Sequence, residues 1–127
     1  MRGLKLMQFL LMWRIKMAGI EATIERKVSE YMLNNFGVEH VKLGKNGWPD
    51  QQYLLGKGQS FYLEFKRQGE KPTPLQKKRL QWLSDNGFAC GWVDTFDHGI
   101  SLVAKEFNRV HKKPLQDHIF RDVDNGC

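Results

Sequence analysis

The sequence contains little cysteine and none of the histidine or cysteine spacings that hold zinc. It has two cysteines in 127 residues, Cys90 inside an apolar run and Cys127 at the last position, so there is no disulfide framework and no CxxC pair. The four histidines, His40, His98, His111 and His118, are scattered and form no HxxxH or HExxH motif. We therefore expect a protein of the reducing cytoplasm that needs neither disulfides nor zinc.

The chain also lacks an apolar run long enough to cross a bilayer. Residues 1–16 are apolar in the middle and basic at both ends, but Arg14 and Lys16 interrupt the run. No small-residue cleavage site follows, as a signal peptide requires, and Met17 begins a stretch that resembles a natural start. We expect residues 1–16 to form an N-terminal extension that is poorly ordered or packs against a partner, and we expect no membrane partner.

The composition is that of one globular domain with an excess of positive charge. A chain of 127 residues can bury a core without disulfides, and 41% of its residues are hydrophobic. We place the domain at 17–111 and a polar tail at 112–127, with no internal repeat or low-complexity linker. The net charge of +6 is compatible with a polyanionic partner but does not identify one.

Hydrophobic periodicity predicts a helix and three strands in the first half of the chain. Apolar residues recur at helical spacing as far as Phe36, and Gly37 is suited to end that helix. The later apolar residues alternate instead, as they do in strands, and a glycine-rich turn at 56–58 joins two of these segments as a hairpin. The predicted elements are a helix over 20–36, a strand over 38–43, and hairpin strands over 51–55 and 60–66.

The second half begins with a capping box. Thr73 suits the N-cap of a helix, Pro74 its first position, and Gln76 completes the box; the pattern ends at Asn86-Gly87. The elements predicted next are a buried strand over 88–94, a turn at 97–99, a short strand over 100–103 and a short helical turn over 105–110. The order of helix, three strands, helix and strand predicts an α/β fold with a mixed sheet, because the hairpin makes part of the sheet antiparallel.

Strand 60–66 places a carboxylate and an ammonium side by side. Alternation puts Phe61, Leu63 and Phe65 on one face, which is core, and puts Glu64 and Lys66 on the other. On its own, such a pair is usually a solvated ion pair. Asp50 changes this interpretation, because the register of the hairpin brings its carboxylate towards Glu64.

Two converging carboxylates repel one another unless a divalent cation lies between them. Oxygen ligands of this kind suit Mg²⁺ or Mn²⁺, which would polarise a phosphodiester and activate a bound water. Lys66 would then position or deprotonate that water, or offset charge on the phosphate. The structural alternative for Asp50 is an Asx-turn that caps the loop after Pro49.

Three features follow one another in order: Gly47-Trp48-Pro49-Asp50, then Tyr62-Leu63-Glu64-Phe65-Lys66, then a helix opened by Gln76. Together they resemble the motifs of the PD-(D/E)XK nuclease superfamily, and more closely those of the VRR-NUC domain. The resemblance covers Glu21 to Val93. It implies a restriction-endonuclease-like core, αβββαβ, in which Asp50 and Glu64 bind the metal and Lys66 is catalytic. It also implies the main-chain carbonyl of Phe65 as a further metal ligand.

The resemblance further implies a glutamate from the first helix and a glutamine from the second. Both Glu21 and Glu25 are available, and we favour Glu21 because it shares the inward stripe of the helix; either one is otherwise a surface carboxylate. Gln76 has two roles open to it, one in the capping box and one directed towards the site, and the resemblance favours the second.

Basic residues surround this predicted site. A basic rim suited to DNA phosphates is formed by Arg67, Lys71, Lys77, Lys78 and Arg79. Each of these residues alone is about equally well explained as part of a solvated helix face. Trp48 is expected either to stack on a base or, as is commoner for a loop tryptophan, to pack on the core.

The leading hypothesis is a Mg²⁺- or Mn²⁺-dependent endonuclease that cuts branched or junction DNA in replication, recombination or repair. By resemblance we expect a homodimer inside a phage-infected or bacterial cell. The first alternative is a non-catalytic nucleic-acid-binding module of the same fold; the intact Asp50, Glu64 and Lys66 argue against it. The second is a membrane-associated interaction protein that uses residues 4–15 as an interfacial helix.

Overall fold

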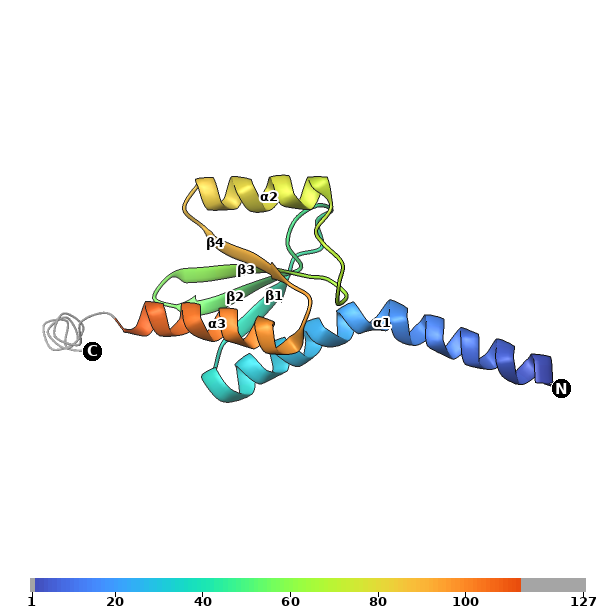
Figure 1. Ribbon diagram of the computed structural model, residues 1–127. Helices are drawn as coiled ribbons and strands as arrows, with labels where there is room; N and C mark the ends of the chain where they lie inside the picture. Colours follow the sequence, from blue (N-terminus) through green and yellow to red (C-terminus); the bar gives the residue numbers. More distant parts are fainter. Residues whose placement is uncertain (1, 113–127) are drawn as a thin grey trace, which may run out of the picture.

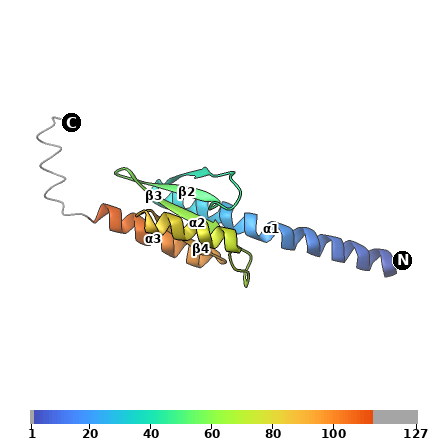
Figure 2. The same ribbon diagram turned by 90° about the horizontal axis from the view of Figure 1, so that it is seen from above.

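The structure is a computed structural model that describes residues 2–112, with side chains described for residues 5–8 and 20–112. The helices are α1 (Arg2–Phe36), α2 (Pro74–Asp85) and α3 (Phe96–His111), and the strands are β1 (Glu39–Lys42), β2 (Gln51–Gly56), β3 (Gln59–Phe65) and β4 (Ala89–Val93). They form three layers, with α2 on one face of the sheet and α3 with the C-terminal half of α1 on the other (Figure 1). The N-terminal half of α1 extends away from these layers (Figures 1 and 2).

The four strands form one mixed sheet in the order β1-β2-β3-β4. The pairs β1–β2 and β2–β3 are antiparallel, whereas β3 and β4 run parallel. Gln51 is opposite Leu63 in the β2–β3 register, so Asp50 at the start of β2 lies beside the end of β3 that carries Glu64. The predicted mixed sheet and the hairpin register are therefore confirmed.

The core lies between the sheet and the pair of helices α1 and α3. Tyr53, Leu63 and Phe65 of the sheet are fully buried, as are Val28 of α1 and Val103 of α3. A close approach of the two helices depends on Gly99, where an added Cβ would lie 2.7 Å from the Val28 side chain. This packing fixes α1, and with it Glu21, relative to the sheet.

The first helix is longer than the sequence analysis predicted. It begins at Arg2 instead of Ile20, so residues 2–16, expected to be a poorly ordered or partner-packing extension, continue α1 as helix. No proline interrupts this stretch, which is rich in the helix-forming residues leucine, methionine, lysine and arginine. No helix among residues 2–112 is both long enough and apolar enough to cross a membrane.

Beyond β4, the predicted turn and strand are wrong, whereas the helical turn over 105–110 is helical but is part of a longer helix. The expected turn at 97–99, strand over 100–103 and helical turn over 105–110 are a single helix, α3, whose N-cap Thr95 accepts a hydrogen bond from the His98 backbone N–H. Ile100, Val103 and Phe107 face the core at spacings of three and four, which a short window over 100–103 cannot distinguish from a strand. Residues 113–127, most of the predicted tail, lie outside the described residues.

The expected buried strand is β4, but it is the edge strand of the sheet and most of it is half-buried. Helices α2 and α3 cover the two faces of β4, but no strand of the described chain pairs with its outer edge. Of the residues of β4, only Val93 is therefore fully buried. The apolar run over 88–94 thus predicted the strand correctly and overstated its burial.

Candidate metal centre

Three carboxyl groups converge at one end of the sheet. Glu21 comes from α1, Asp50 from the residue before β2 and Glu64 from β3, and one oxygen of each lies within 4.8 Å of those of the other two. The three residues are remote in sequence and are brought together by the packing of α1 on the sheet and by the β2–β3 register. Three clustered carboxylates form an oxygen-rich ligand set of the kind that hard divalent cations use.

The hairpin backbone fixes Asp50. Its Oδ2 accepts a hydrogen bond of 2.8 Å from the Phe65 N–H, and its own carbonyl accepts one of 2.9 Å from the Leu43 N–H. The Asp50 carboxylate therefore bonds across to β3, and the predicted alternative of a local Asx-turn is not the contact observed. Phe65 directly follows Glu64 in β3, so the same strand supplies Glu64 and the N–H that holds Asp50.

Glu64 is the most enclosed member of the cluster, with 2% of its surface exposed. Gln76 Nε2 of α2 donates a hydrogen bond of 3.0 Å to Glu64 Oε1, and Lys66 Nζ lies 3.7 Å from the same oxygen. Lys66 is itself only 9% exposed. Glu64 and Lys66, predicted to be neighbours, thus form a buried pair beside the N-terminal turn of α2, and not a solvated surface pair.

The cluster holds more negative charge than the protein neutralises. Burial, followed by repulsion from Asp50, raises the pKa of Glu64 to about 8, against the opposing effect of Lys66. Burial also raises the pKa of Asp50, although the Phe65 N–H works in the other direction, and burial raises that of Glu21. An added cation would relieve this repulsion, so the residues present are suited to a bound divalent metal.

Gln76 has both of the roles that the sequence left open. Its backbone N–H donates to Thr73 Oγ1, and its side-chain Oε1 accepts from the Thr73 N–H at 2.9 Å, which completes the capping box. Its side-chain Nε2 is then directed at Glu64. The helix cap therefore fixes the orientation of the amide: with its oxygen bonded to Thr73, its nitrogen is held towards Glu64.

Glu25, the other candidate from the first helix, lies outside the cluster that Glu21 joins. It is buried, and its Oε2 accepts hydrogen bonds of 2.8 Å from Lys42 Nζ and from Gln51 Nε2. Neither partner was predicted from the sequence, although β1–β2 pairing aligns Lys42 with Gln51. A cavity of ≈ 420 Å³ opens here, lined in part by Glu25, Ser29, His40, Lys42 and Gln51.

The loop before Asp50 is attached to α2. Gly47 lies so close to Leu75 that an added Cβ would be 2.6 Å from its side chain, and φ of +80° suits this position to glycine. The Trp48 ring makes an edge contact with Trp82 at 6.0 Å. Trp48 is half-buried between the loop and the helix and is not part of the hydrophobic core, so its expected role in stacking on a base stays a prediction.

The predicted basic residues occupy the loop and helix that border the cluster. Arg67 forms an ion pair of 2.6 Å with Glu70, whereas Lys71, Lys77 and Lys78 have exposed side chains. Arg79 lies over the Trp48 ring, as does Lys45, with separations of 5.4 Å and 5.2 Å from the ring centroid. Lys45 was not predicted as part of this basic group, because a single loop lysine has no spacing signal of its own.

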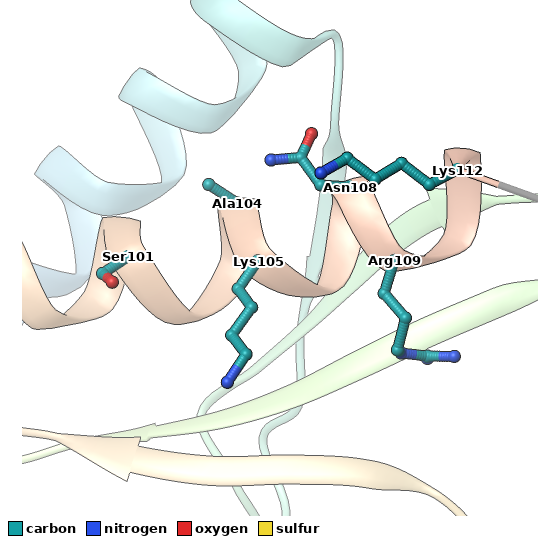
Figure 3. A pocket seen from close by; sticks show the side chains of 6 residues that line it. All are labelled: Ser101, Ala104, Lys105, Asn108, Arg109 and Lys112. Carbon is teal, nitrogen blue, oxygen red and sulfur yellow. The ribbon is translucent and has the colours of Figure 1, made fainter.

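A second cavity, of ≈ 600 Å³, lies along α3 and is lined by none of the candidate site residues. Lys105, Arg109 and Lys112 give it a basic lining, together with Ser101, Ala104 and Asn108 (Figure 3). Arg109 is engaged with Glu106 on the same helix at 2.9 Å. Among the described residues, no group of three clustered carboxylates borders this cavity.

The fold and the cluster together define an α/β protein whose mixed sheet carries an acidic, metal-type site beside a buried lysine. Among solved structures, the chain is similar to a "VRR_NUC domain", with a TM-score of 0.59, 24% sequence identity, and coverage of 67% of this chain and 95% of that one. The predicted fold class is therefore confirmed: the chain has the VRR_NUC fold. No protein-family model and no curated protein matches the sequence.

Proposed function

We propose that this protein is a divalent-metal-dependent endonuclease that hydrolyses DNA phosphodiester bonds. The observation that carries the proposal is the convergence of Glu21, Asp50 and Glu64 beside Lys66 on a VRR_NUC fold. Acidic clusters occur on many proteins, but here Glu64 is enclosed and its pKa is raised to about 8. A buried carboxyl group whose pKa is raised by a neighbouring carboxylate is costly to maintain, which favours a functional role over a structural one.

The bound ion would be Mg²⁺ or Mn²⁺, held by Glu21, Asp50 and Glu64 and, as in the resemblance, by the main-chain carbonyl of Phe65. Such an ion polarises a phosphodiester and lowers the pKa of a bound water. The Phe65 N–H keeps Asp50 in place, and Gln76 keeps the Glu64 carboxyl oriented. These contacts preorganise the carboxylates before the ion binds.

Lys66 is the proposed catalytic residue. Its ammonium lies 3.7 Å from Glu64 Oε1 and is mostly shielded from solvent. From this position it would hold the attacking water or offset the charge that develops on the phosphate, where low solvent exposure strengthens its field. Arg67, Lys71, Lys77 and Lys78 would then attract the phosphates on either side of the cut.

We extend the proposal, on the resemblance, to branched or junction DNA in replication, recombination or repair, and to a homodimer that cuts two strands. The test incubates the protein with supercoiled plasmid, four-way and flap DNA, each with Mg²⁺, Mn²⁺ or EDTA. We expect cutting with either metal, none in EDTA, and none by Asp50→Ala or Glu64→Ala. Glu30→Gln, on the exposed side of the helix that carries Glu21, is the matched control and should cut like the wild type.

The proposal is abandoned if wild-type protein cuts none of these substrates, or if the two alanine variants cut as well as it does. DNA binding without cutting by the wild type would instead support the non-catalytic module of the same fold. Isothermal titration with Mn²⁺ tests the metal site separately from cleavage: the wild type should bind Mn²⁺, and Asp50→Ala should bind it more weakly.

A further inference from the structure

Four aromatic side chains form a continuous surface next to the candidate metal centre, which we call the aromatic surface: Trp48, Tyr62, Trp82 and Phe88. Trp82 and Phe88 are nearly parallel, with ring centroids 6.3 Å apart and planes inclined by 15°. Edge contacts join Trp48 to Trp82 at 6.0 Å and Tyr62 to Phe88 at 5.9 Å. The rings come from a loop, a strand, a helix and the segment before β4, so only the tertiary fold assembles them.

The middle of the aromatic surface is open to solvent. Trp82 is 48% exposed and Phe88 is 45% exposed, although aromatic residues usually contribute their area to cores and interfaces. Helix α2 packs mainly on β4, although Gln76 at its start reaches Glu64 of β3, and from above the helix lies over the β4 side of the sheet (Figure 2). The face of the sheet that carries Tyr62 is therefore only partly covered by the helix.

Both ends of the aromatic surface are close to the carboxyl cluster. Trp48 precedes Asp50 by two residues, and Tyr62 precedes Glu64 by two residues on the same face of β3. Two residues of a strand span about 6.6 Å. A nucleotide chain bound at the cluster would therefore continue over the aromatic rings.

The charge beside the aromatic surface is positive. Lys45 and Arg79 lie over the Trp48 ring, and Lys78 is exposed one helical turn before Trp82. Hydrogen-bonding groups are present as well, since Gln52 Nε2 donates to Tyr62 Oη at 3.3 Å and to Ser60 Oγ at 3.0 Å. Flat apolar rings flanked by cations match the two halves of an unpaired nucleotide, its base and its phosphate.

We propose that the aromatic surface binds unpaired nucleobases of a single-stranded DNA segment next to the bond that the metal centre cuts. The bases stack on Trp82 and Phe88, and Arg79 and Lys78 attract the backbone. Stacking is tolerant of sequence because every base has a π face, so the surface selects for unpaired DNA and not for a particular sequence. This inference rests on the proposed function for its choice of nucleic acid as the ligand.

The test measures binding alone, in EDTA, so that it does not depend on cleavage. Three fluorescently labelled ligands of equal length are compared: a single-stranded oligodeoxynucleotide, the same strand with abasic sites throughout its middle, and a blunt duplex. We expect the wild type to bind the base-bearing strand more tightly than the abasic one. Trp82→Ala and Phe88→Ala should each weaken binding of the base-bearing strand by about tenfold, with little change for the other two ligands.

Two further variants separate stacking from charge and from folding. Trp82→Tyr keeps a ring and should retain most of the binding, whereas Leu33→Ala removes an exposed apolar side chain from the opposite layer and should change nothing. Circular dichroism and thermal melting check that each variant is folded. Equal loss of affinity for all three ligands in Trp82→Ala would mean that the ring does not read bases, and would overturn the inference.

The outcome is separable from that of the proposed function. If the wild type cuts no DNA but prefers the base-bearing strand through Trp82, the nuclease proposal fails and the aromatic surface stands. If the wild type cuts DNA but Trp82→Ala and Phe88→Ala bind the base-bearing strand normally, only the inference fails. Conversion of a dimer into a monomer by Trp82→Ala, with DNA binding unchanged, would identify a self-interface and would also overturn it.

Discussion

The pH dependence of stability in the absence of metal offers a direct test of the electrostatics at Glu64. Burial and the nearby Asp50 raise the pKa of Glu64 from 4.5 to about 8 in the folded protein. The folded state therefore holds a proton that the unfolded chain releases near its ordinary pKa. Any stability associated with that proton is fully present below pH 4.5 and is lost as the pH rises towards 8.

The magnitude follows from the shift. One proton bound in the folded state and absent from the unfolded state changes the free energy of unfolding by about 1.4 kcal/mol per pH unit. Over the window from pH 4.5 to about 8, this amounts to about 5 kcal/mol at most. A small domain has about 5–15 kcal/mol of total stability, so a change of this order is measurable by denaturant unfolding.

Glu64→Gln removes the titration and keeps the shape. The amide oxygen still accepts from Gln76, and the amide nitrogen can donate to the Asp50 carboxylate where the carboxylic acid did. In EDTA we expect the variant to gain stability over the wild type steadily from pH 5 to 8 and by several kcal/mol at pH 8. Urea unfolding at a series of pH values, followed by tryptophan fluorescence, measures the difference, and Glu30→Gln serves as the exposed control.

Metal should reduce the difference in stability between the two proteins at pH 8. An ion at one hundred times its dissociation constant adds about 2.7 kcal/mol to the folded state, so Mn²⁺ should stabilise the wild type and have little effect on Glu64→Gln. Parallel curves of unfolding free energy against pH for the two proteins in EDTA would refute the reasoning. Such curves would mean that Glu64 is ionised in the folded protein at all of these pH values.

Further substitutions test single contacts of the site. Lys66→Ala should reduce turnover by about a hundredfold or more while leaving Mn²⁺ affinity in calorimetry close to that of the wild type; a large loss of affinity would contradict a catalytic role. Glu21→Gln should weaken Mn²⁺ binding, whereas Glu25→Ala should leave it nearly unchanged and lower stability by about 1–3 kcal/mol, because Lys42 and Gln51 lose their acceptor. Gly47→Ala should cost about 1–2 kcal/mol in urea unfolding from its left-handed backbone alone; unchanged stability would show that the loop adapts freely.

Local signals predicted the helices and strands that carry the site. The capping box at Thr73 located the start of α2, the glycine-rich turn located the hairpin, and the alternation of strand 60–66 separated its core face from the face that carries Glu64. Each is a short-range property of the chain, so a single sequence displays it. The prediction over 97–110 divided the apolar residues of one helix between a short strand and a short helical turn, and so missed that they form one continuous helix.

The roles of Glu21 and Glu25 show where such signals stop. The two residues are one helical turn apart, and helical spacing gave only a preference between them. The position of α1 against the sheet assigns Glu21 to the carboxyl cluster and Glu25 to the pair formed by Lys42 and Gln51. That position depends on side chains from three elements, including the close contact at Gly99.

The sequence by itself determined the chemistry available to this protein: a carboxylate before one strand, a carboxylate and a lysine on the next, and a glutamine at a helix start. Only the tertiary structure decided that Glu64 is buried, that Gln76 serves the helix cap and Glu64 together, and that four distant aromatic residues form one surface. The physical reason is the separation along the chain of the residues that interact. Caps, turns and alternation act between near neighbours, whereas burial and electrostatic strain depend on elements that meet only when the chain folds.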